Sequence, residues 1–248
     1  MNAKRSYAKI TLKLTMAAVF AALVCMTTIA FVVSIPATTG YFNVGEAIIY
    51  VAALLFGPYV GAFAGGLGAA MADVLVAPVF APGTLVIKSI EGAIVGFLGK
   101  KLVTQTSKTN WKIYTTLLGA IVGVLLAITG SLYYSGNVEL YLGFPSPQTP
   151  TFAGFIPAGV WYFLGGIVAL LIIFTGFRIE PEFGWAIFST IIGGLEMVAG
   201  YFFYEQIILS KATAIVEIPV NIGQMLIGLI VAIPVVKFVL KSFPRLKS

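Results

Sequence analysis

The sequence predicts an all-α membrane protein, a polytopic bundle of about eight transmembrane helices. Of its 248 residues, 59% are hydrophobic and only 10% are charged, and the mean hydropathy is +1.02. A soluble domain carries roughly a quarter charged residues, so this composition excludes a soluble protein. Apolar runs recur along the chain at lengths suited to a hydrocarbon core of ~30 Å. No polar segment is long enough for a separate soluble domain, so we expect 1–248 to form a single transmembrane domain.

The apolar runs define the expected helices in order. The predicted spans are 14–35, 46–60, 61–78, 83–99, 112–132, 155–177, 186–204 and 218–236. The second and third spans are short and meet at FGPYVG, a Gly-Pro turn that can join two helices tightly. The first span follows basic residues, as a signal peptide does, but its apolar stretch of ~22 residues is longer than a signal core. We therefore expect it to remain as the first helix.

Positive charge predicts the orientation of this bundle. Eight spans place both termini on one side, and thirteen Lys and Arg residues fall on that side. Lys211 falls on the other side, and Lys88 lies within a span. Because cytoplasmic segments carry the excess of Lys and Arg, we expect a multi-pass protein of the cell membrane with both termini cytoplasmic. This distribution also accounts for the net charge of +6 without a nucleic acid partner.

The composition excludes several kinds of chemistry. Histidine is absent, which removes Ser-His and Cys-His catalysis and histidine-ligated metal. The single cysteine, Cys25, cannot form an internal disulfide. The sequence has no Gly-Lys-Ser/Thr phosphate loop. We expect neither an enzyme nor a cofactor or metal, and work driven by ATP would require another subunit.

Charged and amide residues inside the apolar runs are the candidate functional residues. A charge at the bilayer centre costs roughly 3 kcal/mol on insertion scales, so each one calls for an explanation. The candidate substrate-binding residues are Asn43, Glu46, Asp73, Lys88, Glu91, Glu196, Tyr201, Asn221 and Gln224. With the orientation above they fall in the outer half of the membrane, while the inner half has almost none. This distribution predicts a polar pocket that opens to the outside.

Structural roles for these residues remain open. Asn43 and Glu46 stand three apart and could form a helix N-cap with a glutamate reaching back to it. Lys88 could pair with Asp73 or Glu91, or extend toward the membrane surface. The amide pair of the last span could hydrogen-bond across helices without any ligand.

Small residues on the third span predict close helix packing. A row at four-residue steps is formed by Gly57, Gly61, Gly65, Ala69 and Asp73. Such a ridge lets a neighbouring helix approach closely. Packing explains the glycines, but it does not explain the carboxylate at the end of the row.

The order of these motifs resembles a known family. The run YFNVGEAIIYVAALLFGPYVGAFAGGLGAAMADVL is followed by FAPGTLVIKSIEGAIVGFLGKK, and the last two spans contain IIGGLEMVAGYFFYE and EIPVNIGQMLIGLIVAIP. These stretches resemble the substrate-binding S components of energy-coupling factor (ECF) transporters, in the branch for pyrimidine, riboflavin and related vitamins. The resemblance covers about 14–100 and 186–240.

The resemblance implies a function and partners. An S component binds a vitamin or precursor from outside and then docks in the lipid bilayer on a membrane T component that carries two ATPase subunits. It is thought to topple in the membrane to deliver its pocket to the cytoplasmic side. Small residues of the first helix mediate docking in that family, and MAAVFAALV supplies them here as Ala17, Ala18, Ala21 and Ala22.

One departure from the family concerns the number of helices. Members usually have six spans, which here would correspond to 14–106 and 181–248. Residues 107–180 would then be an inserted helix pair with an extracellular segment at 133–154. That segment is interpreted either as a plain surface loop or as a lid over the pocket.

A second functional hypothesis comes from the acidic residues themselves. A stand-alone, ion-coupled secondary transporter or a channel could use Asp73, Glu91 and Glu196 to relay protons or bind Na⁺. Such proteins often carry polar residues through the whole membrane depth and contain inverted repeats with broken helices. Neither feature is found in the sequence, which favours the S component.

Overall fold

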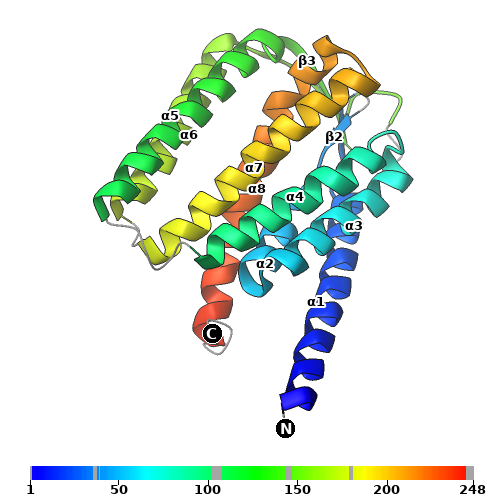
Figure 1. Cartoon of the computed structure of the whole chain (residues 1–248). Coiled ribbons are helices and arrows are strands. Elements are labelled where there is room, and N and C mark those ends of the chain that lie inside the picture. Colours follow the sequence, from blue (N-terminus) through cyan, green and yellow to red (C-terminus); the bar gives the residue numbers. More distant parts are fainter. Residues whose placement is uncertain are drawn as a thin grey trace.

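The computed structural model describes residues 2–35, 38, 40–101, 108–142, 147–178 and 181–243, and these form a helical bundle (Figure 1). The helices of the described part are α1 (Asn2–Ala30), α2 (Glu46–Phe56), α3 (Pro58–Val76), α4 (Ala81–Lys101), α5 (Lys108–Tyr133), α6 (Ala158–Arg178), α7 (Pro181–Ile208) and α8 (Lys211–Ser242). Seven of these described helices are long and apolar enough to cross a membrane. The predicted all-α polytopic bundle is confirmed.

The second predicted span forms a helix that is too short to cross. The 11 residues of α2 extend about 16 Å at 1.5 Å per residue, roughly half the hydrocarbon core. The helix ends at Gly57, whose φ of 91° suits only glycine, and Pro58 begins α3. The Gly-Pro turn is therefore where the sequence predicted it. Most of α2 is buried, so it is a core helix enclosed by the others.

The small-residue ridge of α3 packs against the backbone of α4. A Cβ atom added to Gly61 would lie 2.6 Å from the carbonyl oxygen of Gly92, and one added to Gly65 would lie 2.7 Å from the carbonyl oxygen of Lys88. Real Cβ atoms do not come this close, so only glycine permits the observed helix spacing. The predicted close packing is confirmed, and it brings the backbone of α4 at Lys88 against Gly65 of α3.

A four-stranded antiparallel sheet lies at the end of the bundle away from the termini (Figure 1). Its strands are β1 (Val33–Ile35), β2 (Gly40–Phe42), β3 (Gly136–Leu142) and β4 (Phe152–Ile156), in the order β2-β1-β3-β4. The segment 133–154, predicted to be extracellular, therefore contains strand structure, and β3 pairs with β1 in the connection after α1.

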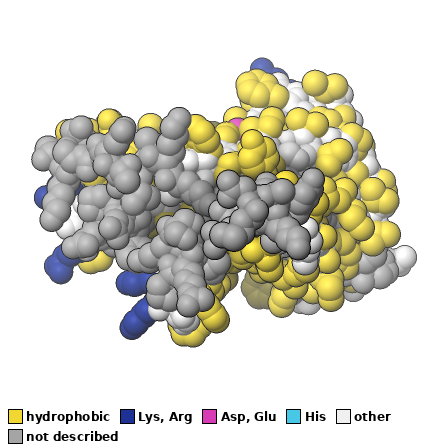
Figure 2. Space-filling view, turned by 60° about the horizontal axis from the view of Figure 1, so that its bottom comes forward, with side chains coloured by type: hydrophobic (Ala, Val, Ile, Leu, Met, Phe, Trp, Pro, Cys, Tyr) yellow, Lys and Arg dark blue, Asp and Glu magenta, His cyan; other side chains and the backbone are white. Residues whose placement is uncertain are grey.

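Both termini lie at the opposite end of the bundle (Figure 1). Exposed basic side chains of this end are Lys13, Lys112, Arg178, Lys237 and Lys241. Figure 2 shows this end, with Lys and Arg side chains at its rim and hydrophobic side chains over the flank of the molecule. An apolar flank with a basic end is the surface expected of a membrane-spanning bundle.

Candidate functional site

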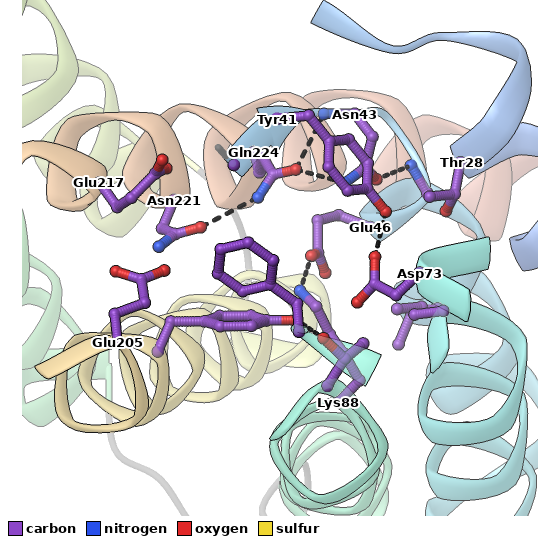
Figure 3. Close-up of a pocket in the computed structure, with 17 residues that line it drawn as sticks. Thr28, Tyr41, Asn43, Glu46, Asp73, Lys88, Glu205, Glu217, Asn221 and Gln224 are labelled. Atoms are coloured by element: carbon purple, nitrogen blue, oxygen red, sulfur yellow. Dashed lines mark hydrogen bonds and ion pairs between the residues drawn. The ribbon is translucent and has the colours of Figure 1, made fainter. Parts of the chain in front are cut away.

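A polar cavity lies between β2 and helices α1, α2, α3, α4, α7 and α8 (Figure 3). It is lined by Thr28, Gly40, Tyr41, Asn43, Gly45, Glu46, Ile49, Ala69, Asp73, Phe80, Thr84, Lys88, Tyr201, Glu205, Glu217, Asn221 and Gln224. Its free volume of ≈ 40 Å³ holds a few water molecules but no aromatic ring. Binding of a heterocycle would therefore require wall side chains to move apart.

Lys88 lies in an ion cluster at the wall of this cavity. Its Nζ is ion-paired with Oε1 of Glu46 and lies 3.2 Å from Oε2 of Glu91. The exposed fractions are 4% for Lys88, 1% for Glu46 and 0% for Glu91, so all three charges are withdrawn from solvent. The Tyr50 hydroxyl donates a hydrogen bond of 2.9 Å to Glu91. Of the two partners considered for Lys88 in the sequence, Glu91 is confirmed, and Glu46 takes the place of Asp73.

The start of α2 differs from the capping arrangement considered in the sequence. Gly45 is the N-cap, and no side chain caps the helix. Glu46 turns toward Lys88, while Oδ1 of Asn43 accepts a hydrogen bond of 2.9 Å from the backbone N–H of Gly45. The capping interpretation is wrong because a buried ion pair satisfies the Glu46 carboxylate better than a single backbone donor would.

Amide side chains connect α8 to the segment before α2. Oε1 of Gln224 accepts hydrogen bonds from the backbone N–H of Asn43 at 2.9 Å and from its Nδ2 at 2.6 Å. Nε2 of Gln224 donates to Oδ1 of Asn221 at 3.1 Å. The network fixes the orientation of both amides, so the pocket presents them in a defined way.

Two tyrosines form hydrogen-bonded parts of the wall. The Tyr41 hydroxyl donates to Oδ1 of Asp73, and the Tyr201 hydroxyl is 2.7 Å from Oγ1 of Thr84. Burial, and then the charge of Asp73, raise the pKa of Tyr41 far above its ordinary value, so this phenol remains a donor. Nζ of Lys88 lies 5.5 Å from the centre of the Tyr201 ring. Such rings offer flat faces for a planar substrate.

The structure brings most of the predicted residues to one cavity. The predicted residues that line it are Asn43, Glu46, Asp73, Lys88, Tyr201, Asn221 and Gln224. Glu91 lies behind Lys88 and is fully buried. Glu196 is partly exposed and does not line the cavity, and its Oε2 has no hydrogen-bond partner within the described part of the chain.

Sequence reasoning missed two carboxylates of the lining. Glu217 stands four residues before Asn221 on α8, and Glu205 stands four residues after Tyr201 on α7. The i, i+4 spacing places each of them on the face of a residue already selected, and this signal could have found them. The lining residues Thr28 and Thr84 carry no such signal, because a threonine in an apolar helix can bond its own backbone.

The alanines proposed for docking lie on two sides of α1. Ala17 packs with Val60 and Ala64 of α3, and Ala21 is buried as well. Ala18 and Ala22 are exposed. One Ala-xxx-Ala pair therefore packs inside the protein, while the other lies on its surface.

Comparisons with known proteins agree with this architecture. Residues 9–179 match the family model described as ECF-type riboflavin transporter, S component. The match includes α5 and α6 and ends just before α7. A protein of Pyrococcus woesei, described as an uncharacterized protein in gap 3′region, is 47% identical over 118 residues, which are 48% of this chain and 73% of that protein. No solved structure matches the chain.

Proposed function

The chain belongs to the family of ECF-type riboflavin transporter S components, and from this we propose how it works. It is a multi-pass cell membrane protein and the substrate-binding subunit of a vitamin transporter. It captures a small vitamin-like heterocycle from outside in the cavity described above. It then hands this substrate to a membrane T component with two ATPase subunits. Members of this family are transport subunits and not enzymes.

The observation that carries the proposal is the buried polar cavity. Five helices and a strand bring carboxylates, amides, a lysine and tyrosines together inside an otherwise apolar bundle. Polar groups buried in a membrane protein are expensive and are typical of substrate pathways. The cavity is lined by β2 and by the beginnings of α2, α4 and α8, which lie toward the end opposite the termini. The basic residues at the terminal end support a cytoplasmic location for that end.

Two features support transfer to a coupling module. The given sequence contains no Gly-Lys-Ser/Thr phosphate loop, which is consistent with ATP hydrolysis by separate ATPase subunits. Ala18 and Ala22 form an exposed small-residue pair on α1, where a partner helix can approach closely. We assign the docking contact to this exposed pair, while Ala17 and Ala21 hold α1 to its own bundle.

Uptake measurements test the hand-over. Bacterial cells that produce the chain together with a T component and two ATPase subunits should accumulate radiolabelled riboflavin or a related vitamin. Cells with a catalytically inactive ATPase should not. Uptake by proteoliposomes that contain the chain alone, driven by an ion gradient, would replace the proposal with a secondary transporter.

Binding measurements test the pocket. Gln224→Leu removes the acceptor that organises Asn43 and should weaken equilibrium binding to the purified protein about fivefold to a hundredfold, since a lost hydrogen bond in a buried site costs about 1–3 kcal/mol. Gln206→Leu is the matched control, because that side chain lies outside the cavity and donates to the carbonyl of Phe202 on its own helix. Equal affinity in both variants would contradict this assignment of the pocket.

A further inference from the structure

We propose that the side of the pocket between α7 and α8 is a subsite for a positively charged, N–H-bearing group of the substrate, formed by Glu205, Glu217 and Asn221. The inference rests on the proposed function and specifies the chemical class of the substrate. Ammonium, amidinium and protonated aminopyrimidine groups belong to this class, whereas a neutral flavin ring does not.

Acidic side chains outnumber basic ones in the lining of the cavity. Four carboxylates, those of Glu46, Asp73, Glu205 and Glu217, line the cavity together with one cation, Lys88. That lysine is already shared between Glu46 and Glu91. Neither Glu205 nor Glu217 forms an ion pair with any lysine or arginine that the structure describes. The pocket therefore offers negative charge that the described side chains do not neutralise.

The unsatisfied hydrogen-bond acceptors of the lining also indicate a ligand that carries donors. Glu205 is 2% exposed and Glu217 is 3% exposed. Thr38 donates to Oε1 of Glu217, but Oε2 of Glu205 has no donor among the described residues. On another wall of the same cavity, Oε2 of Glu46 is likewise buried without a donor. Both unsatisfied lining atoms are acceptors, so a complementary ligand must bring donors.

Both carboxylates line the part of the cavity between α7 and α8. Figure 3 shows the Glu205 carboxylate of α7 directed toward α8, with the Asn221 amide between it and Glu217. Two buried like charges destabilise each other unless a cation or a proton lies between them. An ammonium or amidinium group would satisfy both carboxylates, and the nearby faces of Tyr201 and Phe80 could stabilise its charge further.

A matched pair of probes tests the subsite. The compounds are 5-aminomethyl-2-methylpyrimidin-4-amine, which is an ammonium at neutral pH, and its 5-hydroxymethyl analogue, which is neutral and of almost the same size. Calorimetry on the purified full chain in detergent should show the ammonium compound binding at least about tenfold more tightly, since hydrogen bonds to charged groups contribute about 1.5–3 kcal/mol. Riboflavin serves as a neutral ring of the kind named by the family.

Isosteric variants locate the effect. Glu205→Gln and Glu217→Gln should each reduce the affinity for the ammonium compound about tenfold or more and change that for the hydroxymethyl analogue much less. Asn221→Asp adds a carboxylate at the same place and should increase the preference for the ammonium compound. Glu139→Gln is the control, because Glu139 is exposed on β3 outside the cavity. The gain expected from Asn221→Asp keeps the test decisive if a Gln variant folds poorly.

Several outcomes would overturn the subsite. One is that riboflavin or the hydroxymethyl compound binds as tightly as the ammonium compound or more tightly, with an affinity that the Gln variants do not change. This result would mean that the two carboxyl groups share a proton and serve packing. Absence of binding by the ammonium compound would also overturn it. The proposed function fails separately, when no labelled vitamin accumulates in cells with the complete transporter.

Discussion

Replacing Lys88 with methionine should destabilise the protein strongly. The side chain keeps its length, but Glu46 and Glu91, which are 1% and 0% exposed, lose their shared cation. Removing one partner of a buried ion pair costs about 3–5 kcal/mol, because the remaining charge stays buried without compensation. Here two charges remain, so we expect a loss at the upper end of that range.

Neutralising the remaining charges should reverse most of this loss. In the triple variant Lys88→Met, Glu46→Gln, Glu91→Gln, no charge of the cluster remains, and the Tyr50 hydroxyl can still donate to the side-chain carbonyl at position 91. A neutralised cluster avoids the desolvation penalty, so at least about half of the lost stability should return. The triple variant should nevertheless fail to bind substrate.

Unfolding in mixed micelles at increasing dodecyl sulfate, followed by tryptophan fluorescence, measures these differences in free energy. Lys211→Met is the control, because Lys211 is exposed at the start of α8 and its replacement should change stability by less than about 0.5 kcal/mol. If Lys88→Met unfolds like the control, or if the triple variant is no more stable than the single one, the charge-compensation argument is refuted.

Two further predictions concern packing and orientation. Gly61→Ala should lower stability by about 1–3 kcal/mol, because the new Cβ meets the Gly92 carbonyl oxygen. Gly166→Ala, with nothing within 4 Å of the new atom, should raise stability by up to ~1 kcal/mol through helix propensity. Equal changes in stability for Gly61→Ala and Gly166→Ala would contradict the tight α3–α4 contact. In a chain whose native cysteine is replaced by serine, Asn137→Cys on β3 should react with an impermeant maleimide in intact cells, and Lys241→Cys on α8 only after permeabilisation. The reverse labelling would invert the proposed orientation.

The sequence allowed the helical bundle to be predicted because apolar runs that cross a membrane need about 20 residues, a length that leaves little ambiguity. The exception was 46–60, where the Gly-Pro turn was recognised but the span was taken as longer than the 11 residues of α2. A helix enclosed by others is as apolar as one that crosses lipid, so hydropathy does not distinguish them. The assignment of 107–180 as an inserted pair stays a prediction.

The strands were not predicted, for a different reason. β1 and β2 have three residues each, which is too short for the alternation of period two that identifies a strand. Their pairing with β3 joins Val33 to Leu142 across more than a hundred residues, and no local pattern encodes such a contact.

The pocket could be predicted from the polar residues because each is costly inside a membrane and therefore informative. The pairing of charged side chains inside the pocket could not be predicted, since several carboxylates lay within reach of Lys88 by sequence position. Only the tertiary arrangement selects Glu46 over Asp73 as the second partner. Glu205 was left out because it stood at the expected membrane surface, where a carboxylate needs no special explanation, yet it is 2% exposed in the fold.

The three residues of β1 have a mechanical consequence. One edge of this strand is bonded to β2, which brings Tyr41 and Gly40 into the pocket wall, and the other edge is bonded to β3, which follows directly from α5. Backbone hydrogen bonds of β1 thus connect the α5–α6 helix pair to the cavity wall, beside the bond from the Tyr134 hydroxyl to the carbonyl of Val216 on α8. A displacement of α5 relative to the other helices would therefore be transmitted through β3 and β1 to Gly40 and Tyr41 in the cavity wall.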